Sequence, residues 1–371
     1  QIKGLDGVET VHIDIFGDAT DDVTLALKTA TGSNDSLNIL LDSKTNDTAI
    51  DGGDITVTGI ENVTITSGGQ ESATATANVA NVIDLASTAT TASTLTIAGD
   101  RKLTIDSVDN QFTTVNVTNT AGSDLTIAAG GILDFNGGSA ADRLELDLLT
   151  DLTSLDSLAG GEGKDTLAFS QVVGTDFSAA QIATFSGFEV LEYVGTHTIS
   201  GAAATVDLTK LEGINELKLV GELTTNNTGT LTATVKGDSG MKVVMGGHTS
   251  TGGNAGFLVL DVKNSANAGT DDTVTVALTD IGSADAHAGF TADNVENVVV
   301  ELAGGATAAT YTLADIDGAQ VTDLTIASTN TDLDAAGKVK ASDGLTLTTV
   351  ESTMLTSVDA SAMTGALNLN G

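Results

Sequence analysis

Short stretches in which apolar and polar residues alternate recur along this 371-residue chain. Alternation with a period of two puts every second side chain on one face, as in a half-buried β-strand. The stretches are rich in Val, Ile, Leu and Thr and are bounded by Gly, Asp, Asn or Ser. They predict strands at 10–15, 54–60, 62–66, 94–99, 102–106, 114–119, 124–128, 216–220, 230–237, 273–278, 297–302, 323–328 and 345–350.

Helical candidates are few and short. The best are SLDSLAG at 154–160 and FSAAQIATF at 177–185. The sequence therefore predicts an all-β fold with a few short helices.

One motif is a small turn followed by a strand that begins with an apolar residue and Glu. Gly or Asn makes the turn, and the apolar residue enters the core. The Glu is either a repeated contact to a cation or a cap, or an exposed strand residue beside a turn. The copies contain Glu9, Glu61, Glu189 and Glu296, and LEGINELKL at 211–219 is a copy with the Glu displaced by one.

A second motif is Gly-x-x-Asp followed by a strand. Its copies align around Asp35, Asp142, Asp165 and Asp272, and GDATDDVTLAL at 17–27 is a looser copy with Asp18, Asp21 and Asp22. A single turn-strand unit cannot bury its apolar face, so its neighbours must cover it. The repeats therefore predict an elongated β-solenoid or β-sandwich modules, divided into a β-rich module (1–136), a calcium-binding segment with short helices (137–200) and a second β-rich module (201–371).

The charge is strongly acidic, with 50 Asp and Glu against 14 Lys and Arg and a formal net charge of −36. Such a field repels nucleic acid and anionic membranes. No apolar stretch reaches the roughly 18 residues that a membrane-spanning helix needs. Most of the acids are Asp, which in Gly-rich turns can ligate calcium together with backbone carbonyls; solubility is the alternative reason for the charge.

The most specific motif is GGEGKDTLA at 160–168, which fits the calcium-binding nonapeptide G-G-x-G-x-D-x-U-x. Its candidate ligand residues are Gly160, Gly161, Gly163 and Asp165. A near match has Gly137, Gly138 and Asp142, with Ala140 in place of the third Gly. The alternative to calcium at both is an ordinary Gly-rich turn with a solvated Asp.

The near match begins 23 residues before the first motif, which is too far for the adjacent turn of an ideal roll. The segment between them should then loop out or form a helix. Weaker calcium candidates are Asp35, Asp272 and Asp22, and the pair Asp51 and Asp54.

Catalytic constellations are scarce in the sequence. The chain has no Cys, no G-x-S-x-G elbow and only two Tyr and no Trp, and its four His residues lack metal-ligand spacing. We therefore expect a protein that is not an enzyme.

The stretch 92–195, with NGGSAADRLEL, AGGEGKDTLAF and FSGFEVLEY, resembles the surface-layer proteins that Gram-negative bacteria export by type I secretion. The closing SVDASAMTGALNLNG at 357–371 is similar to their solenoid turns. The resemblance implies an extracellular structural subunit of a self-assembling lattice on the cell surface. It implies Ca²⁺ bound at repeats-in-toxin (RTX) turns around Asp142 and Asp165, with further copies of the chain and cell-surface polysaccharide as partners.

Two other functions share these features. A segment of a large RTX adhesin would bind a surface or a glycan, and the carrier domain of an exported hydrolase would have its catalytic part elsewhere. The chain opens at Gln1 without a signal-peptide pattern, which predicts an internal or processed piece of a longer protein.

Overall fold

The chain forms two compact units of β-structure, described here from a computed structural model. Unit 1 comprises Gln1–Ser170 and Ser178–Glu189, and unit 2 comprises Gln171–Phe177 and Val190–Gly371. The structure describes residues 2–5, 10–13, 22–29, 32–42, 49–69, 80–128, 130–171, 174, 176–195, 197–200, 204–221, 223–226, 230–236, 240–246, 248–251, 258–263, 272–279, 286–303, 310–328, 344–363 and 365–369.

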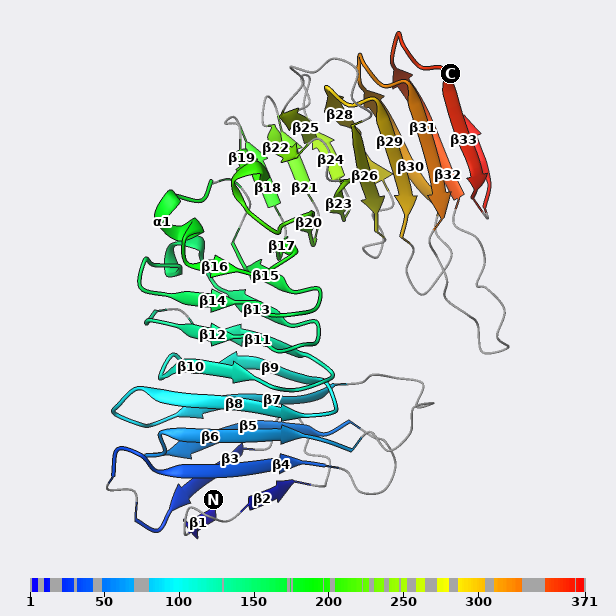
Figure 1. The fold of residues 1–371 in the computed structure, drawn as a ribbon. Helices are drawn as coiled ribbons and strands as arrows, with labels where there is room; N and C mark the ends of the chain where they lie inside the picture. The colour runs from blue at the N-terminus through cyan, green and yellow to red at the C-terminus, as the bar shows by residue number, and fades with distance from the viewer. Residues whose placement is uncertain are drawn as a thin grey trace. The chain divides into compact units, whose positions relative to one another are not determined.

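Unit 1 is a stack of coils, each contributing one strand to each of two parallel sheets (Figure 1). Sheet A1 contains, in spatial order, β1 (Ile2–Leu5), β3 (Asp22–Leu27), β5 (Asp51–Thr58), β7 (Asn81–Ser87), β9 (Leu103–Val108), β11 (Ser123–Ile127), β13 (Arg143–Leu146) and β15 (Thr166–Phe169). Sheet B contains β2 (Thr10–Ile13), β4 (Ser36–Leu41), β6 (Asn62–Ser67), β8 (Ser93–Gly99), β10 (Phe112–Val117), β12 (Asp134–Asn136), β14 (Ser157–Ala159) and β16 (Phe185–Ser186).

Unit 2 is a second stack of parallel coils. Sheet A2 contains β17 (Val190–Tyr193), β20 (Glu216–Leu219), β23 (Met241–Met245), β26 (Thr273–Leu278), β29 (Asn297–Leu302), β31 (Asp323–Ser328) and β33 (Ser357–Ala362). Sheet C begins as two rows: β18 (His197–Ser200), β21 (Leu223–Asn226), β24 (His248–Thr251) and β27 (Ala286–His287) in one, and β19 (Ala204–Asp207), β22 (Leu231–Lys236), β25 (Leu258–Lys263) and β28 (Phe290–Asp293) in the other. Both rows pair with the long strand β30 (Thr310–Asp317), followed by β32 (Gly344–Glu351) and β34 (Leu367–Leu369).

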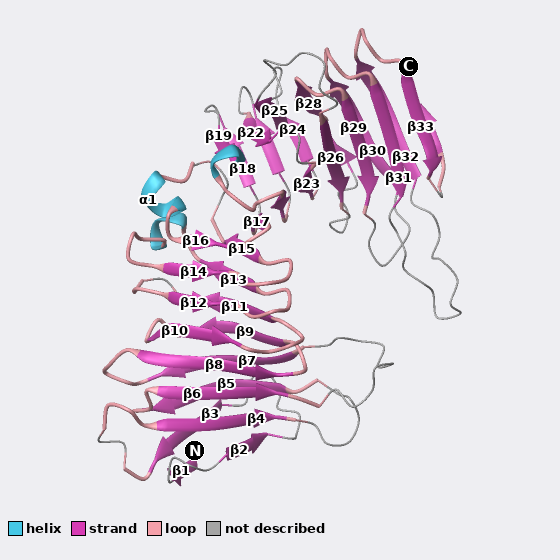
Figure 2. Cartoon of the chain, in the orientation of Figure 1, coloured by secondary structure: helices cyan, strands magenta, loops and turns pink. Residues whose placement is uncertain are grey.

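Helical structure is limited within the described residues (Figure 2). It comprises the one-turn helix α1 (Ala179–Ile182) and two 3₁₀ turns, η1 (Leu149–Asp151) and η2 (Leu208–Lys210). Ser178 caps α1 by accepting a hydrogen bond from the Gln181 N–H. No helix in these ranges is long and apolar enough to cross a membrane.

The core consists of columns of aliphatic side chains stacked from coil to coil. In sheet A1, Ile105, Leu125, Leu144 and Leu167 are opposite one another in successive strands, and all four are fully buried. The alternation read from the sequence thus places one face of each strand inside the stack, where only the neighbouring coils can cover it. With few aromatics, this packing rests on repeated β-branched and Leu side chains.

The all-β fold is confirmed, and the parallel coils make it a solenoid rather than a set of sandwiches. All thirteen predicted strands lie on observed strands, within the described residues. The helix predicted at 177–185 is confirmed as α1, but the helix predicted at 154–160 is wrong. Leu158 instead pairs in register with Phe135 and Phe185, because parallel stacking outweighs a weak local helical preference. The division into three domains at 136 and 200 stays a prediction.

Candidate functional site

The two Gly–Asp turns lie in consecutive coils of unit 1. The first connects β12 to β13 and the second connects β14 to β15, and both strand pairs are in register, with Arg143 opposite Thr166. The 23-residue separation of Asp142 and Asp165 is therefore one complete coil. The expectation that 23 residues is too far for an adjacent turn is wrong, because η1 and β14 lie on the path of the coil itself.

The glycines of these turns are required by close stacking. A methyl group built on Gly137 would lie 1.7 Å from the Gly160 carbonyl oxygen, and one on Gly160 would lie 1.9 Å from that of Gly187. Gly161 and Gly163 have φ angles of +107° and +124°, which L side chains rarely adopt. The turn backbones thus pack against one another, with no room for side chains between them.

A ladder of carboxylates connects the same turns. Glu189 Oε2 accepts a hydrogen bond from the backbone N–H of Asp165 at 2.8 Å. Asp165 Oδ1 accepts one from the N–H of Asp142 at 2.7 Å, and Asp142 Oδ1 accepts one from the N–H of Ser123, also at 2.7 Å. Each acid therefore satisfies a backbone donor one coil earlier, at the point where a strand of sheet A1 begins.

The two sequence motifs pair in this way elsewhere. The Asp35 N–H donates to Glu61 Oε2 at 2.9 Å, and the Asp272 N–H donates to Glu296 Oε2 at 3.2 Å. The Gly-x-x-Asp copy and the apolar-Glu copy thus occupy equivalent positions in successive coils. The cap interpretation of the Glu motif is confirmed at Glu61, Glu189 and Glu296, while Glu9 lies outside the described residues.

The sequence motifs were not predicted to pair, although the spacing between them indicates that they lie about one coil apart. The hydrogen-bonded Asp–Glu pairs are 26, 24 and 24 residues apart, close to one coil. Glu189 is the residue this would have added to the site.

Asp165 is the exceptional rung of the ladder. Its side chain is fully buried, and its Oδ2 has no hydrogen-bond partner within the part of the chain that the structure describes. Burial, with the nearby charges of Asp142 and Glu189, raises the pKa of Asp165 to about 6, although the bond from the Asp142 N–H acts in the opposite direction. At neutral pH the carboxylate is thus mainly ionised, and among the described residues no donor compensates the charge at Oδ2.

Asp142 differs, since both of its oxygens accept hydrogen bonds. Oδ1 accepts from the N–H and hydroxyl of Ser123, and Oδ2 accepts from the Gly138 N–H at 2.8 Å. Its two oxygens are already satisfied by the protein.

The other candidate ligands lie apart from this ladder. Asp35 precedes a strand of sheet B, where the chain passes from sheet A1 to sheet B, whereas the Asp142 and Asp165 turns make the return passage. Asp272 is buried before β26 in unit 2. Asp18, Asp21 and Asp271 lie outside the described residues.

Asp22 belongs to an acidic row on the outer face of sheet A1. It is exposed and opposite Asp54, which is opposite Asp84. Burial, a hydrogen bond to Asp54 and the charges of Asp54 and Asp106 raise the pKa of Asp84. Among the described residues, no group of three or more His, Asp or Glu side chains is arranged to hold a metal ion. Any cation at the candidate sites would therefore need backbone carbonyls as well.

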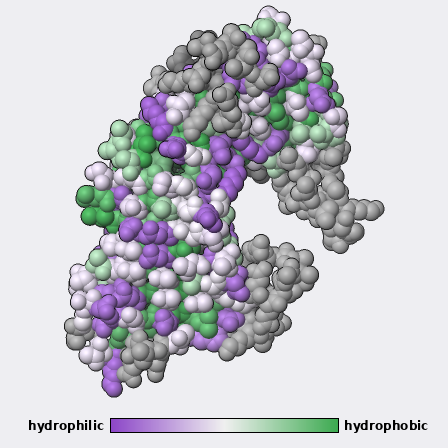
Figure 3. Space-filling view, viewed as in Figure 1, coloured by the Kyte–Doolittle hydropathy of each residue, from purple (hydrophilic) through white to green (hydrophobic). Residues whose placement is uncertain are grey.

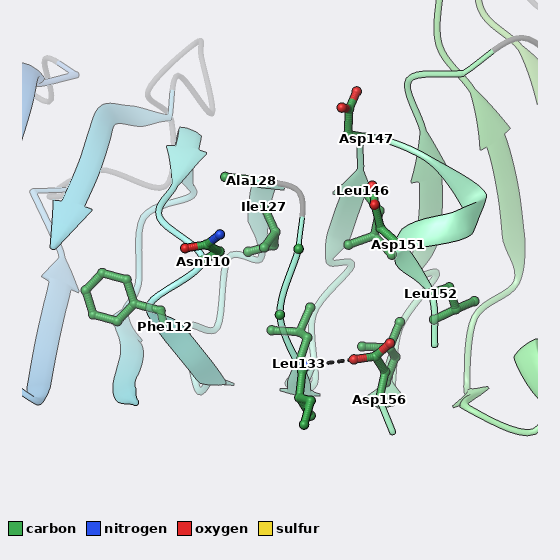
Figure 4. A pocket seen from close by; sticks show the side chains of 14 residues that line it. Asn110, Phe112, Ile127, Ala128, Leu133, Leu146, Asp147, Asp151, Leu152 and Asp156 are labelled. Carbon is green, nitrogen blue, oxygen red and sulfur yellow. Dashed lines mark hydrogen bonds between the residues drawn. The ribbon is translucent and has the colours of Figure 1, made fainter. Parts of the chain in front are cut away.

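A small hollow in unit 1 lies away from the Gly–Asp turns, where the chain passes from sheet A1 to sheet B after β11 and β13 (Figure 4). It is lined mainly by apolar residues, among them Ile127, Leu146 and Leu152, and has a volume of about 30 Å³. Asp156 at its rim accepts a hydrogen bond from the Leu133 N–H at 2.7 Å, which holds the neighbouring coil in place. The hollow has room for about one water molecule rather than a small-molecule ligand.

The fold and these turns define an acidic parallel β-solenoid. On the face drawn in Figure 3, hydrophilic and hydrophobic residues are interspersed over its described surface. Comparison of the chain with protein-family models, with curated proteins and with solved structures gives no match.

Proposed function

We propose that this chain is a structural part of a calcium-dependent, self-assembling bacterial surface layer, and that it acts outside the cell. The observation that carries the proposal is the buried Oδ2 of Asp165 in the stacked glycine turns, which accepts no hydrogen bond from any described residue. A buried carboxylate oxygen that is ionised at neutral pH needs a positive partner. The resemblance of 92–195 to RTX-type surface-layer proteins is a second support for the proposal.

The turn that contains Asp165 fits a calcium ion better than the turn that contains Asp142, because both carboxylate oxygens of Asp142 already accept hydrogen bonds. Asp165 would supply a carboxylate oxygen, and the backbone carbonyls of Gly160, Gly161 and Gly163 are the further oxygens offered by its turn. Calcium takes six to eight oxygen ligands and tolerates irregular geometry. When bound, the ion would supply positive charge that neutralises the acidic turn and joins consecutive coils.

The charge of the chain gives calcium a role in folding. A net charge of −36 opposes compaction where free calcium is low. Where calcium is abundant, ligand binding to the folded state alone adds free energy to folding, about 2.7 kcal/mol at a concentration one hundred times the Kd. Export as a loosely folded chain and folding outside the cell follow from this difference.

The calcium step is tested by thermal unfolding and calorimetric titration of three proteins: the unchanged chain, Asp165→Asn and Asp134→Asn. Asp134 is exposed on β12 of the same unit, so its substitution removes the same charge without touching the turn. We expect calcium to stabilise the unchanged chain and Asp134→Asn, and to have little effect on Asp165→Asn. Equal stability of the unchanged chain in calcium and in chelator would contradict the proposal.

The assembly step is tested by electron microscopy of the protein with calcium and with chelator. We expect two-dimensional arrays that disappear on chelation. Isolated fibres that bind a glycan or a solid surface would instead support an RTX adhesin.

A further inference from the structure

Exposed aliphatic side chains gather on one edge of unit 1, which we call the apolar edge. Ile132 is 51% exposed, Leu148 43% and Leu155 67%. Ile132 lies between β11 and β12, and the other two lie between β13 and β14, so all three belong to the passages from sheet A1 to sheet B in consecutive coils. Figure 3 shows hydrophobic residues gathered at this edge, beside β12 and β14. Single exposed aliphatic residues are ordinary on a protein surface, whereas a group of them is typical of an interaction site.

Ile132 and Leu155 are neighbours in the stack. The next residues along the chain are joined directly: the Leu133 N–H donates to Asp156 Oδ1 at 2.7 Å, and the Leu133 carbonyl accepts a hydrogen bond from the Ser157 N–H at 2.9 Å. Strands of consecutive coils are about 4.7–4.9 Å apart. Ile132 and Leu155 therefore lie side by side, one coil apart.

The core does not need these exposed side chains. The same passages supply Leu133, Leu149 and Leu152 to the interior, where none of the three is more than 7% exposed. The small hollow of about 30 Å³ is lined by Ile132 together with Leu133 and Leu152, so it lies at the apolar edge. Its space is about that of one water molecule, which is close to that of a methyl group. One methyl group of a partner can therefore enter it.

Only acidic groups supply charge around the apolar edge. The stretches 130–134 and 146–157 contain four Asp and no Lys or Arg. Asp134 and Asp147 are exposed and Asp151 is half-buried. None of these three makes an ion pair with a described residue. The edge thus combines an apolar surface with negative charge that the described part of the chain does not neutralise.

We propose that the apolar edge is a docking site for a basic amphipathic helix of another protein. The apolar face of the helix packs on Ile132 and Leu155, and its Lys or Arg side chains pair with the surrounding Asp residues. Residues three or four apart on a helix have Cβ atoms about 5–6 Å apart, close to the spacing of consecutive coils. Amphipathic helices bind apolar surfaces through residues at this spacing, and complementary charge fixes their orientation.

The charge of the edge argues against the other occupants. A second copy of the chain has 14 Lys and Arg against 50 acids, so it would bring mostly like charge to these Asp residues. An anionic membrane would be repelled for the same reason. The proposal depends neither on calcium at Asp165 nor on assembly into a surface layer.

The test measures the binding of two synthetic helical peptides of about 18 residues by calorimetry. One has Leu at helical spacing and Lys elsewhere, and the other has Glu in place of each Lys. The proteins are the unchanged chain, the double variant Ile132→Ser/Leu155→Ser and the control Met354→Ser/Val358→Ser. Met354 and Val358 are 52% and 46% exposed in unit 2, so the control also removes two exposed apolar side chains.

We expect the Lys peptide to bind the unchanged chain and the control with the same affinity, and to bind Ile132→Ser/Leu155→Ser roughly tenfold more weakly or less. The Glu peptide should bind none of the three. The same affinity of the Lys peptide for all three proteins would mean that it binds the acidic chain at large, which would overturn the proposal. Binding of the Glu peptide as tightly as the Lys peptide would overturn it as well.

A second measurement covers a double variant that does not fold. Amide hydrogen exchange of the unchanged chain, with and without the Lys peptide, should show added protection in 130–134 and 146–157. Protection confined to other segments contradicts the proposal. Vesicles of phosphatidylcholine are the last probe: the unchanged chain should not bind them, and binding that Ile132→Ser/Leu155→Ser abolishes would make the edge a lipid-binding surface instead.

Discussion

Asp165 accepts a hydrogen bond through Oδ1 from the backbone N–H of Asp142, one coil earlier in the solenoid, at 2.7 Å. An acidic side chain of one coil thus accepts a hydrogen bond from a backbone N–H of the preceding coil, at the point where a strand begins. The same relationship links Asp35 to Glu61 and Asp272 to Glu296. Of the acids that the sequence offered as calcium ligands, Asp142 and Asp165 therefore already accept hydrogen bonds from the backbone, and Oδ2 of Asp165 is buried with no hydrogen-bond partner among the described residues.

Two substitutions of Asp165 distinguish the contribution of its hydrogen bond to stability from the contribution of its charge. Asp165→Ala leaves the Asp142 N–H buried without an acceptor, which should cost about 1–3 kcal/mol of unfolding free energy. Asp165→Asn keeps an acceptor oxygen and should cost less in chelator. Urea unfolding and hydrogen exchange of the Asp142 amide measure both effects, and equal losses for Ala and Asn would contradict the ladder.

The raised pKa of Asp165 predicts a pH dependence in the absence of calcium. The folded group binds its proton more tightly than the unfolded group, with a pKa of about 6 against 3.8. The resulting stabilisation is complete below about pH 4 and is lost as the pH rises to about 6. Subtracting the pH profile of Asp165→Asn from that of the unchanged chain, both in chelator, should isolate this fall.

Calcium should alter that profile in a defined direction. Because a cation competes with the proton for Asp165, calcium affinity should rise between pH 4 and 6. Titrations at fixed ionic strength measure it, and an affinity independent of pH would argue against Asp165 as a ligand.

The stacked turns predict unequal costs for two glycine substitutions. Gly161 and Gly195 have similar φ angles, +107° and +99°. A methyl group on Gly161 would lie 2.2 Å from the Gly138 carbonyl oxygen, whereas one on Gly195 has nothing within 4 Å. Gly195→Ala should cost about 1–2 kcal/mol from backbone strain alone, and Gly161→Ala roughly 2 kcal/mol more. Similar thermal stabilities for the two variants would contradict the close stacking.

The strands could be predicted from the sequence because each is a local pattern. Alternation places one face of a strand inside whichever strands pair with it. The strand at 273–278 could therefore be predicted from TVTVAL alone, without its neighbours β23 and β29. Stacking could not be predicted in the same way, since it depends on which coil follows which and on how much chain connects them. Asp142 and Asp165 looked too far apart for this reason.

The pairing of the Asp and Glu motifs could not be predicted because the two motifs use different side chains, not because they are far apart in the sequence. Aspartate and glutamate place their carboxylates at different distances from the backbone, and their flanking residues differ. Asp165 and Glu189 therefore read as separate motifs although each caps the coil before it. The spacing of about one coil was the available signal.

Asn81 is a structural residue that no motif marks, and it yields a final prediction. It is fully buried on β7, where its Oδ1 accepts a hydrogen bond from the Ile50 N–H at 2.9 Å. Its Nδ2 is within hydrogen-bond distance of Ser67 Oγ and the carbonyls of Leu41 and Gly68. One side chain thereby joins segments 13 to 40 residues away in the chain.

Asn81→Ala should accordingly destabilise unit 1 by about 2–4 kcal/mol, because it leaves a buried N–H and buried carbonyls without partners and opens a small cavity. Asn136→Ala is the matched control: Asn136 is exposed on β12, and its amide donates solvent-exposed hydrogen bonds to the side chains of Asn116 and Asp134. Its loss should stay within about 0.5 kcal/mol. Urea unfolding of the two variants decides the matter, since comparable losses would mean that the buried amide contributes no more to coil stacking than a surface one.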